Sequence, residues 1–281
     1  MLSEVPSISG ENATSADAVR ERKRTLNLRI ALVMPALDEE DALPLVLAEL
    51  PEGVVDRVVV CDNGSSDRTA EVAREGGAVV VHEPERGYGA ACLAGLALLE
   101  RGDEDFAPLE AHDLVVFLDA DHSDFPEDVL GILEPLLDGS ADFVIGSRVL
   151  GGATMDALLP QAWFGNRLAC GLMRLLFGAR YSDLGPFRAL RNEALQALDM
   201  QDRDFGWTVE MQLKAKVFGL RVTEVPVRYR ARIGKSKITG TLTGTLRAGF
   251  KILGWIFGWR LKLWFTRPRN PRSLEAVRNA R

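Results

Sequence analysis

Four short apolar runs in the N-terminal half of the chain are each followed by a polar turn. Each run has the length of a strand that is buried on both faces, as in a parallel sheet. The runs cover residues 28–34, 54–61, 78–82 and 115–118. Helical patterns follow the first three runs at 45–50, at 69–75 and from residue 86 onward. This alternation predicts an α/β fold with a doubly wound, mostly parallel sheet.

The second half of the chain contains longer helical patterns and fewer apolar runs. We expect helices at 126–137, 160–177, 191–198 and 205–218, and strands at 142–145 and 221–227. Residues 183–188 contain a Gly-Pro pair and are expected to form a turn.

Two carboxylates, Asp119 and Asp121, directly follow the apolar run at 115–118. In an open α/β sheet the carboxyl ends of the strands face the ligand-binding crevice. Two carboxylates one residue apart in a turn can share a hard divalent cation with the phosphates of a bound nucleotide. The alternative is an acidic loop that only caps the next helix.

Charge is distributed unevenly along the 281 residues. Residues 221–281 carry 15 Lys/Arg and 2 Asp/Glu, whereas residues 1–220 carry 19 and 38, so a net charge of −6 hides segments of +13 and −19. A basic C-terminal part suggests an anionic partner, either nucleic acid or an anionic membrane surface. The tail contains no known nucleic-acid-binding motif, and the acidic body would repel phosphate backbones.

The three cysteines lack metal or disulfide spacing and are expected to be reduced core residues.

Residues 241–265 form an apolar pattern that contains three tryptophans, Trp255, Trp259 and Trp264, with Lys and Arg between them. The longest charge-free run is eight residues, 252–259, against the roughly 18 needed to span a bilayer. The pattern is typical of an interfacial helix on anionic lipid. Packing in the core and a homodimer contact are the alternatives. The expected organisation is a flexible leader at 1–25, a catalytic domain at 26–239, an amphipathic helix at 240–266 and a basic tail at 267–281.

With these motifs in order, the chain resembles glycosyltransferase family 2, in the branch of dolichyl-phosphate mannose synthase and bacterial polyprenyl-phosphate hexosyltransferases. The resemblance covers about residues 28–260. It rests on residues 35–40, 62–67, 86–91, 119–121, 146–148, 183–188, 206–210 and 232–237. It implies a GT-A fold, a nucleotide-sugar donor and a divalent metal, Mg²⁺ or Mn²⁺.

The resemblance also assigns the donor-side residues. It implies that Asp62 contacts the nucleotide base and that Asp119 and Asp121 face the metal and the diphosphate. The same base pocket is expected to be lined by Pro35, Leu37 and Glu39. Close relatives have a metal-binding Gln where this chain has Ser123, so a weaker ligand or a water must replace it.

Cations are needed where negative charge develops on the leaving diphosphate. Arg148 and Arg188 are the candidates for contacts with the diphosphate or the acceptor, and a structural ion pair is the alternative for each. A crowded basic loop is expected to hold the acceptor phosphate through Arg232, Lys235, Ser236 and Lys237. The resemblance places Asp183 and Glu210 near the acceptor, where we expect them to orient arginines or the sugar.

The predicted activity is metal-dependent, inverting transfer of a hexose from a UDP- or GDP-sugar to a polyprenyl phosphate or another anionic acceptor. The protein is expected to be cytoplasmic and peripheral on the inner face of the cell membrane. One alternative is a family 2 enzyme that uses a hydroxyl acceptor. Another is a sugar-nucleotide nucleotidyltransferase, which would carry a glycine-rich basic loop where this chain has residues 38–40, Asp-Glu-Glu.

Overall fold

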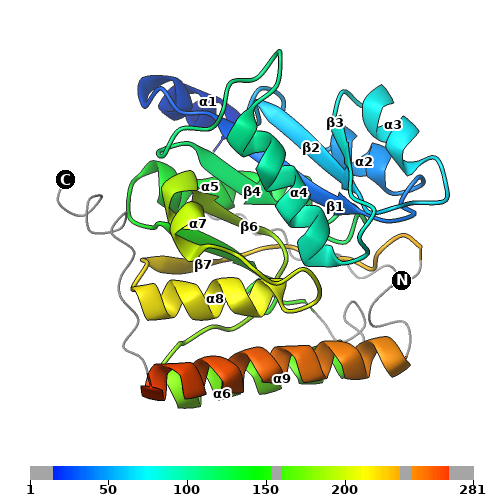
Figure 1. Cartoon of the computed structure of the whole chain (residues 1–281). Helices are drawn as coiled ribbons and strands as arrows, with labels where there is room; N and C mark the ends of the chain where they lie inside the picture. The colour runs from blue at the N-terminus through cyan, green and yellow to red at the C-terminus, as the bar shows by residue number, and fades with distance from the viewer. Residues whose placement is uncertain (1–14, 154–159, 235–241, 266–281) are drawn as a thin grey trace, which may run out of the picture.

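A seven-stranded, mostly parallel sheet forms the centre of the protein (Figure 1). The computed structural model describes residues 15–153, 160–234 and 242–265. The sheet order is β3-β2-β1-β4-β6-β5-β7. Its strands are β1 (Ile30–Ala36), β2 (Arg57–Asp62), β3 (Val79–His82), β4 (Leu114–Phe117), β5 (Phe143–Ser147), β6 (Arg188–Arg191) and β7 (Val222–Pro226). The predicted α/β class and doubly wound sheet are confirmed.

Strand β6 was not predicted from the sequence. It pairs antiparallel with both β4 and β5 and so separates these two strands in the sheet. The strand has only four residues and has arginines at both ends, which are typical of a surface segment. All four residues are nevertheless buried, because the strand lies between two central neighbours. Arg188 therefore begins a strand, where the sequence pattern predicted the end of a turn.

The helices cover both faces of the sheet. They are α1 (Ala16–Thr25), α2 (Leu43–Ala48), α3 (Thr69–Glu75), α4 (Tyr88–Arg101), α5 (Val129–Leu137), α6 (Pro160–Phe177), α7 (Asn192–Leu198), α8 (Trp207–Phe218) and α9 (Leu242–Phe265), with a short 3₁₀ turn η1 at Pro126–Asp128. Helices α3 and α6 have the bounds that the sequence predicted. The helix expected at 126–137 is divided into η1 and α5.

Part of the expected flexible leader is helical. Residues 16–25 form α1, whose first turn is capped by the Ser15 hydroxyl, which accepts the Ala18 N–H at 3.2 Å. Val19 is fully buried in the core, and Lys23 donates to the Asp56 carboxylate at 2.8 Å. The helix contains one buried apolar residue among many charges, so its sequence looked like a solvated segment. The prediction of a flexible leader is therefore wrong for residues 16–25.

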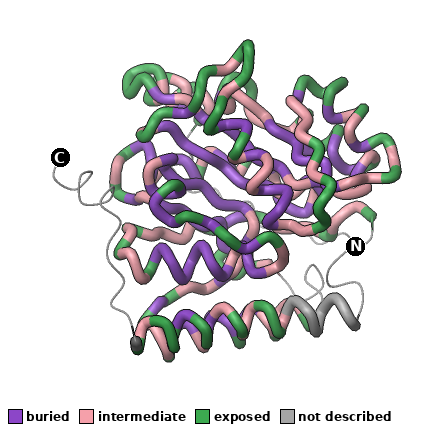
Figure 2. Tube along the Cα trace, in the orientation of Figure 1, coloured by how far each residue is buried: buried purple, intermediate pink, exposed green. Residues whose placement is uncertain are grey.

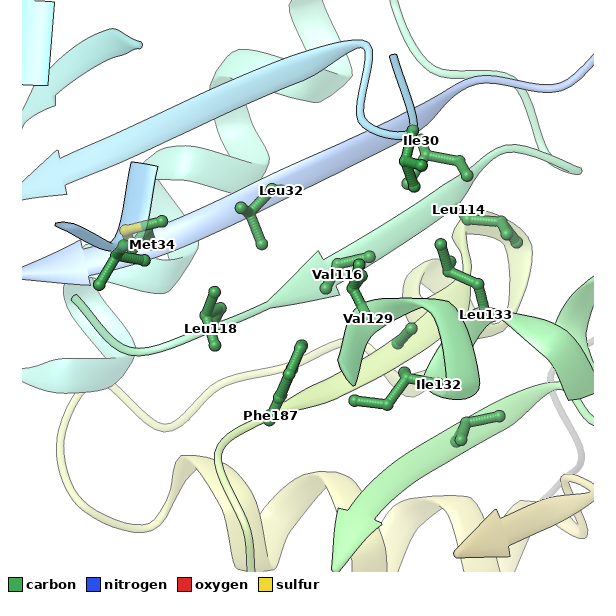
Figure 3. Packing of buried hydrophobic residues seen from close by; sticks show 14 of the residues in the cluster. Ile30, Leu32, Met34, Leu114, Val116, Leu118, Val129, Ile132, Leu133 and Phe187 are labelled. Carbon is green, nitrogen blue, oxygen red and sulfur yellow. The ribbon is translucent and has the colours of Figure 1, made fainter. Parts of the chain in front are cut away.

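Alternate side chains of the central strands fill the core on the two faces of the sheet. Ile30, Leu32 and Met34 of β1 pack on one face with residues of β4 and α5 (Figure 3). Ala31 and Val33 point to the opposite face. The three cysteines are free and buried, as the sequence predicted. This two-sided core fixes the register of the parallel strands, so their carboxyl ends lie at one edge.

Helices α6 and α9 lie side by side beyond α8, at the bottom of Figure 1. A third apolar cluster joins them to α8 through Met173, Val209, Leu213 and Ile256. In the coloured part of α9 in Figure 2 most positions are exposed or intermediate, and the buried ones are Ile256 and Trp259. In the described parts of the chain, no helix combines the length and the apolar character that crossing a membrane would require.

Candidate active site

The turn after β4 carries the two carboxylates predicted to face a metal. The backbone N–H of Ser123 donates to Asp121 Oδ1 at 2.9 Å, which closes the turn. His122 has a φ of 60°, a left-handed conformation that lets the chain reverse within two residues. The Tyr88 hydroxyl, from the first turn of α4, donates to Asp119 Oδ1 at 2.9 Å. The carboxylates are thus held by a tight turn and by a helix from the neighbouring layer.

Burial, and after it the nearby Asp121 carboxylate, raise the pKa of Asp119 to about 6, against smaller lowering effects of Tyr88, Arg232 and Arg148. Two partly desolvated carboxylates this close favour a cation between them. Among the described residues, no group of three or more His, Cys, Asp or Glu side chains could hold a metal ion. A divalent ion here would take two protein carboxylates and fill its remaining positions with diphosphate or water oxygens, which fits Mg²⁺ or Mn²⁺.

Arg232 places its guanidinium between the donor-side acids. Its Nη1 lies 3.0 Å from Asp121 Oδ2, and its Nη2 lies 2.8 Å from Glu39 Oε1. The segment that carries it is bonded to the acidic turn, because the Ile233 N–H donates to the Asp121 carbonyl at 3.0 Å. The sequence pattern assigns Arg232 to the acceptor phosphate, whereas the structure brings it to Asp121, one of the two carboxylates predicted to face a metal. The positive charge of Arg232 thus occupies a position beside two carboxylates, where a metal cation would also bind favourably.

The remaining residues of the basic loop prediction, Lys235, Ser236 and Lys237, lie outside the described residues. Ser123, at the position of the relatives' Gln, is 1% exposed, and its hydroxyl hydrogen-bonds Tyr229.

The predicted base pocket is assembled from the ends of β1 and β2. Asp62, the last residue of β2, pairs in register with Ala36 of β1. Its carboxylate accepts the Ser65 N–H at 2.9 Å and lies 3.1 Å from His82 Nδ1. Burial raises the pKa of Asp62, but the bonds from Ser65 and His82 outweigh burial and hold it below its usual value. Asp62 is therefore held as an anion, which can accept further hydrogen bonds.

The loop after β1 is tied to the loop after β2. The Asp38 N–H donates to the Ser65 hydroxyl at 3.0 Å, and the buried Glu39 donates its N–H to the Thr69 hydroxyl at 2.8 Å. Pro35, near the end of β1, and Leu37, directly after that strand, are both partly exposed. The structure thus brings together the four residues predicted for the base pocket.

Arg148 and Asp183 form a two-pronged ion pair. Arg148 Nε and Nη2 each donate to Asp183 at 2.8 Å, and the Arg148 N–H donates to Asp183 Oδ2 at 2.9 Å. Burial raises the pKa of Asp183, but Arg148 outweighs it and holds the pKa below its usual value. This geometry fixes the plane of the guanidinium. Asp183 orients an arginine, as expected. Arg148 makes a structural ion pair, which was the alternative to a contact with the diphosphate or the acceptor.

Arg188 is fully buried and donates to backbone carbonyls of Leu184, Gly185 and Thr208. Burial lowers its pKa to about 10. Its guanidinium therefore braces the turn that carries Asp183 rather than facing solvent at the edge of the sheet.

Glu210 is also fully buried and lies apart from the arginines. It accepts the N–H groups of Gln201 and Asp202 at 2.9 and 2.7 Å, and it pairs with Lys214 at 2.6 Å. Its partner is a lysine one turn along its own helix and not an arginine, so the first of its two expected tasks is wrong, and the orientation of the sugar stays a prediction. Its visible role is to hold the loop before α8.

Two residues of the site were missed by sequence reasoning. The resemblance includes Tyr88 only as one of residues 86–91 and gives it no role, although its hydroxyl reaches Asp119. Asp124 is 2% exposed, and neither carboxylate oxygen has a hydrogen-bond partner among the described residues. Burial raises its pKa well above the usual range. Its place three residues after Asp121 was the only available signal.

Comparison with known proteins shows the family of this chain. Residues 31–198 match the model of glycosyl transferase family 2. An uncharacterised glycosyltransferase of Mycobacterium tuberculosis is 36% identical over 224 residues, which cover 78% of this chain and 94% of the relative. The undecaprenyl-phosphate mannosyltransferase of Micrococcus luteus is 30% identical over 234 residues, covering 77% of this chain and 90% of that protein.

Among solved structures, the chain resembles glucosyl-3-phosphoglycerate synthase from Mycobacterium tuberculosis, solved with Mn²⁺, UDP-glucose and glycerol 3-phosphate. The TM-score is 0.66 at 22% identity, covering 89% of this chain and 86% of that chain. At this identity the likeness shows the GT-A fold alone. From the family match and these relatives, the chain belongs to glycosyltransferase family 2 and is a glycosyltransferase.

Proposed function

We propose that this glycosyltransferase moves a hexose from a nucleotide diphosphate sugar to a polyprenyl phosphate, with a divalent metal and with inversion at the anomeric carbon. The observation that carries the donor half is the pair Asp119 and Asp121 after β4, together with Asp62 at the end of β2, with β1 between these two strands. The observation that supports the acceptor half is the name of the Micrococcus luteus relative, an undecaprenyl-phosphate mannosyltransferase.

In this proposal each group has a physical task. Asp62 accepts an N–H of the base, and Glu39 and Leu37 complete that pocket. Asp119 and Asp121 hold Mg²⁺ or Mn²⁺, which neutralises charge on the leaving diphosphate when it is bound. Arg148, aligned by Asp183, faces the diphosphate or the acceptor phosphate as a pre-oriented cation.

Arg232 has a place in the same scheme. When a metal takes the Asp121 carboxylate, the guanidinium loses one anionic partner and keeps Glu39. A phosphate oxygen of donor or acceptor would replace the lost partner, because an arginine fork matches phosphate geometry.

A hydroxyl acceptor is the second candidate. It is favoured by Asp124, a buried carboxylate with no hydrogen-bond partner among the described residues, because a hydroxyl acceptor needs a general base and a phosphate does not. We place the polyprenyl phosphate acceptor first, because the name of the Micrococcus luteus relative contains such an acceptor.

We propose that the enzyme works as a peripheral protein on the inner face of the cell membrane. Helices α6 and α9 contain no Asp or Glu in their 18 and 24 residues. Several large apolar side chains on these two helices are exposed, namely Phe164, Leu168, Leu175, Phe250, Phe257, Leu261 and Trp264. This combination of exposed apolar and basic residues suits an anionic lipid surface.

The first test is donor binding and transfer with UDP-glucose, GDP-mannose and UDP-N-acetylglucosamine, with Mg²⁺ or Mn²⁺ and with or without a short polyprenyl phosphate. We expect Asp121→Ala to abolish metal-dependent donor binding in titration calorimetry while the circular dichroism spectrum stays unchanged, because the side chain lies in a turn. Asp105→Ala, at an exposed carboxylate in the loop after α4, is the matched control. Wild-type affinity in an Asp119→Ala, Asp121→Ala double variant would disprove the metal site.

A further inference from the structure

The Asp202 side chain joins the loop 199–206 to α9. It is 3% exposed, and its Oδ1 accepts the N–H groups of Asp204 and Gly206 at 2.7 and 3.0 Å. Its Oδ2 faces α9, where it accepts the indole N–H of Trp255 and lies 3.2 Å from Lys251 Nζ. One buried carboxylate thus connects two segments that are about 50 residues apart in sequence.

The fit around Asp202 is tight. A Cβ atom at Gly206 would lie 2.4 Å from two ring atoms of Trp255 and 2.5 Å from Asp202 Oδ2. On the other side of the loop, Glu210 accepts the N–H groups of Gln201 and Asp202. The loop is therefore held by α8 at its start and by α9 at its end. Because the contacts are this close, a shift of the Trp255 ring must move Asp202 or Gly206.

The same loop caps the N-terminus of α4. The N–H groups of Gly89 and Ala90, which have no partner within the helix, donate to the carbonyls of Asp204 and Arg203 at 3.2 and 2.9 Å. Cβ atoms at Gly87 and Gly89 would lie 2.0 and 1.9 Å from the carbonyl oxygens of Arg203 and Asp202. No side chain caps this helix, so the loop backbone sets where α4 begins.

Tyr88 lies between these two glycines, and its hydroxyl donates to Asp119 Oδ1 at 2.9 Å. The position of the Tyr88 hydroxyl is thus defined by the backbone that loop 199–206 holds. The described contacts run without interruption from α9 through Asp202 and the loop to α4, Tyr88 and Asp119. Both α9 and this loop lie outside the 31–198 region that matches the family model.

We propose that Asp202 is a positioning residue for the metal carboxylates. By holding the loop against Trp255 and Lys251 of α9, it places Tyr88 to orient Asp119 and so raises the affinity for the divalent metal. This inference rests on the proposed function, since it takes Asp119 as a metal ligand.

The chain has three tyrosines, so 3-fluorotyrosine labelling gives three ¹⁹F NMR signals, and Tyr88→Phe identifies that of Tyr88. Trp255→Phe removes only the indole N–H donor and keeps most of the apolar contact. We expect it to shift the Tyr88 signal in metal-free protein, and Asp202→Asn to do the same. Trp264→Phe is the matched control, because Trp264 is 79% exposed on the same helix. It should leave the signal unchanged.

The second measurement is the affinity for Mn²⁺ alone, from the EPR signal of the free ion. We expect Trp255→Phe to weaken binding several-fold in the wild-type background and to have no further effect in Tyr88→Phe, because both changes act through one contact. An unmoved Tyr88 signal, or an unchanged Mn²⁺ affinity in Trp255→Phe, overturns the proposal. Failure of the proposed function is distinguishable, since Asp121→Ala would then bind Mn²⁺ as tightly as the wild type.

Discussion

Asp119 shows at the scale of one residue how a binding site lowers the stability of the protein that carries it. Its pKa is about 6 against a usual 3.8, first because it is buried and then because Asp121 is close. The folded protein binds a proton there more tightly than the unfolded chain does between these two values. The contribution of Asp119 to the free energy of unfolding therefore falls as the pH rises from about 4 to about 6, and it stays reduced at higher pH.

We expect Asp119→Asn to be more stable than wild type at pH 7.5 in the absence of metal, because it removes one of two close carboxylates. A gain of about 1 kcal/mol would raise the Tm by roughly 2–4 °C in a chain of this size. At pH 4 the difference should vanish, since Asp119 is then protonated in the folded wild type. Thermal unfolding at both pH values checks this, with Asp105→Asn as control. A lower Tm of Asp119→Asn at pH 7.5 would contradict it.

Sequence reasoning found the residues that directly follow predicted strands, because a strand end fixes where its next side chains lie. Asp62, Asp119 and Asp121 are of this kind. Pairings across the chain could not be found in this way. Arg148 meets Asp183 35 residues later, and Arg232 meets Glu39 across 193 residues. Such pairings depend on the sheet order, which β6 changes.

At the scale of elements, predictions succeeded where an apolar run or period marks the element and failed where charged residues interrupt it. Helix α6, with 18 residues, has the predicted bounds, whereas the four-residue β6 was missed. Helix α1 was missed because its contacts are mostly polar, such as the Lys23 contacts with the loop before β2. Local pattern alone carries little information about either element, because their burial comes from tertiary neighbours.

The two faces of α9 have different surroundings. The sequence pattern alone does not tell which face packs on the protein. Ile256 and Trp259 pack inward, so the helix is partly a core element. A Cβ atom added at Gly254 or Gly258 would have nothing within 4 Å, so no other helix in the described parts of the chain packs on these glycines. They form the floor of an open groove of about 390 Å³ between Phe250 and Lys262.

We expect the α6 and α9 face to bind anionic vesicles in a salt-dependent way, because each basic residue near such a surface contributes about 1 kcal/mol. A variant with Phe250→Ser and Trp264→Ser should sediment less with vesicles, since both side chains are at least 75% exposed. Leu45→Ser on α2, 44% exposed, is the control for lost apolar surface elsewhere. Equal sedimentation of wild type with neutral and anionic vesicles would support a partner subunit instead.

At the scale of the whole molecule, charge and chemistry are arranged together. The segment around Arg232 is held at the acidic turn, because the N–H of its neighbour Ile233 donates to the Asp121 carbonyl. Only residues 235–241 separate that segment from α9 in the sequence. An enzyme docked through the α6 and α9 face would hold its acidic N-terminal body away from anionic lipid. A lipid-linked phosphate would then meet the basic segment close to the membrane.

The identity of the acceptor decides which carboxylate matters. Glu210→Gln is a poor test, because removing one partner of a buried ion pair costs about 3–5 kcal/mol and would leave Lys214 without its carboxylate. Asp124 is the better choice, since its oxygens have no hydrogen-bond partner among the described residues, so Asp124→Asn breaks no hydrogen bond there.

For a phosphate acceptor, we expect Asp124→Asn to keep a kcat near that of the wild type, because the attacking oxygen is already anionic and needs no base. Lys237→Ala, in the basic loop predicted from the sequence, should raise the acceptor KM. Steady-state kinetics with a short polyprenyl phosphate, and with the corresponding alcohol in its place, measure both effects. A general base contributes roughly 10²–10⁴-fold to rate. A kcat loss of that size in Asp124→Asn, together with transfer to the alcohol, would therefore identify a hydroxyl acceptor and reject the polyprenyl phosphate.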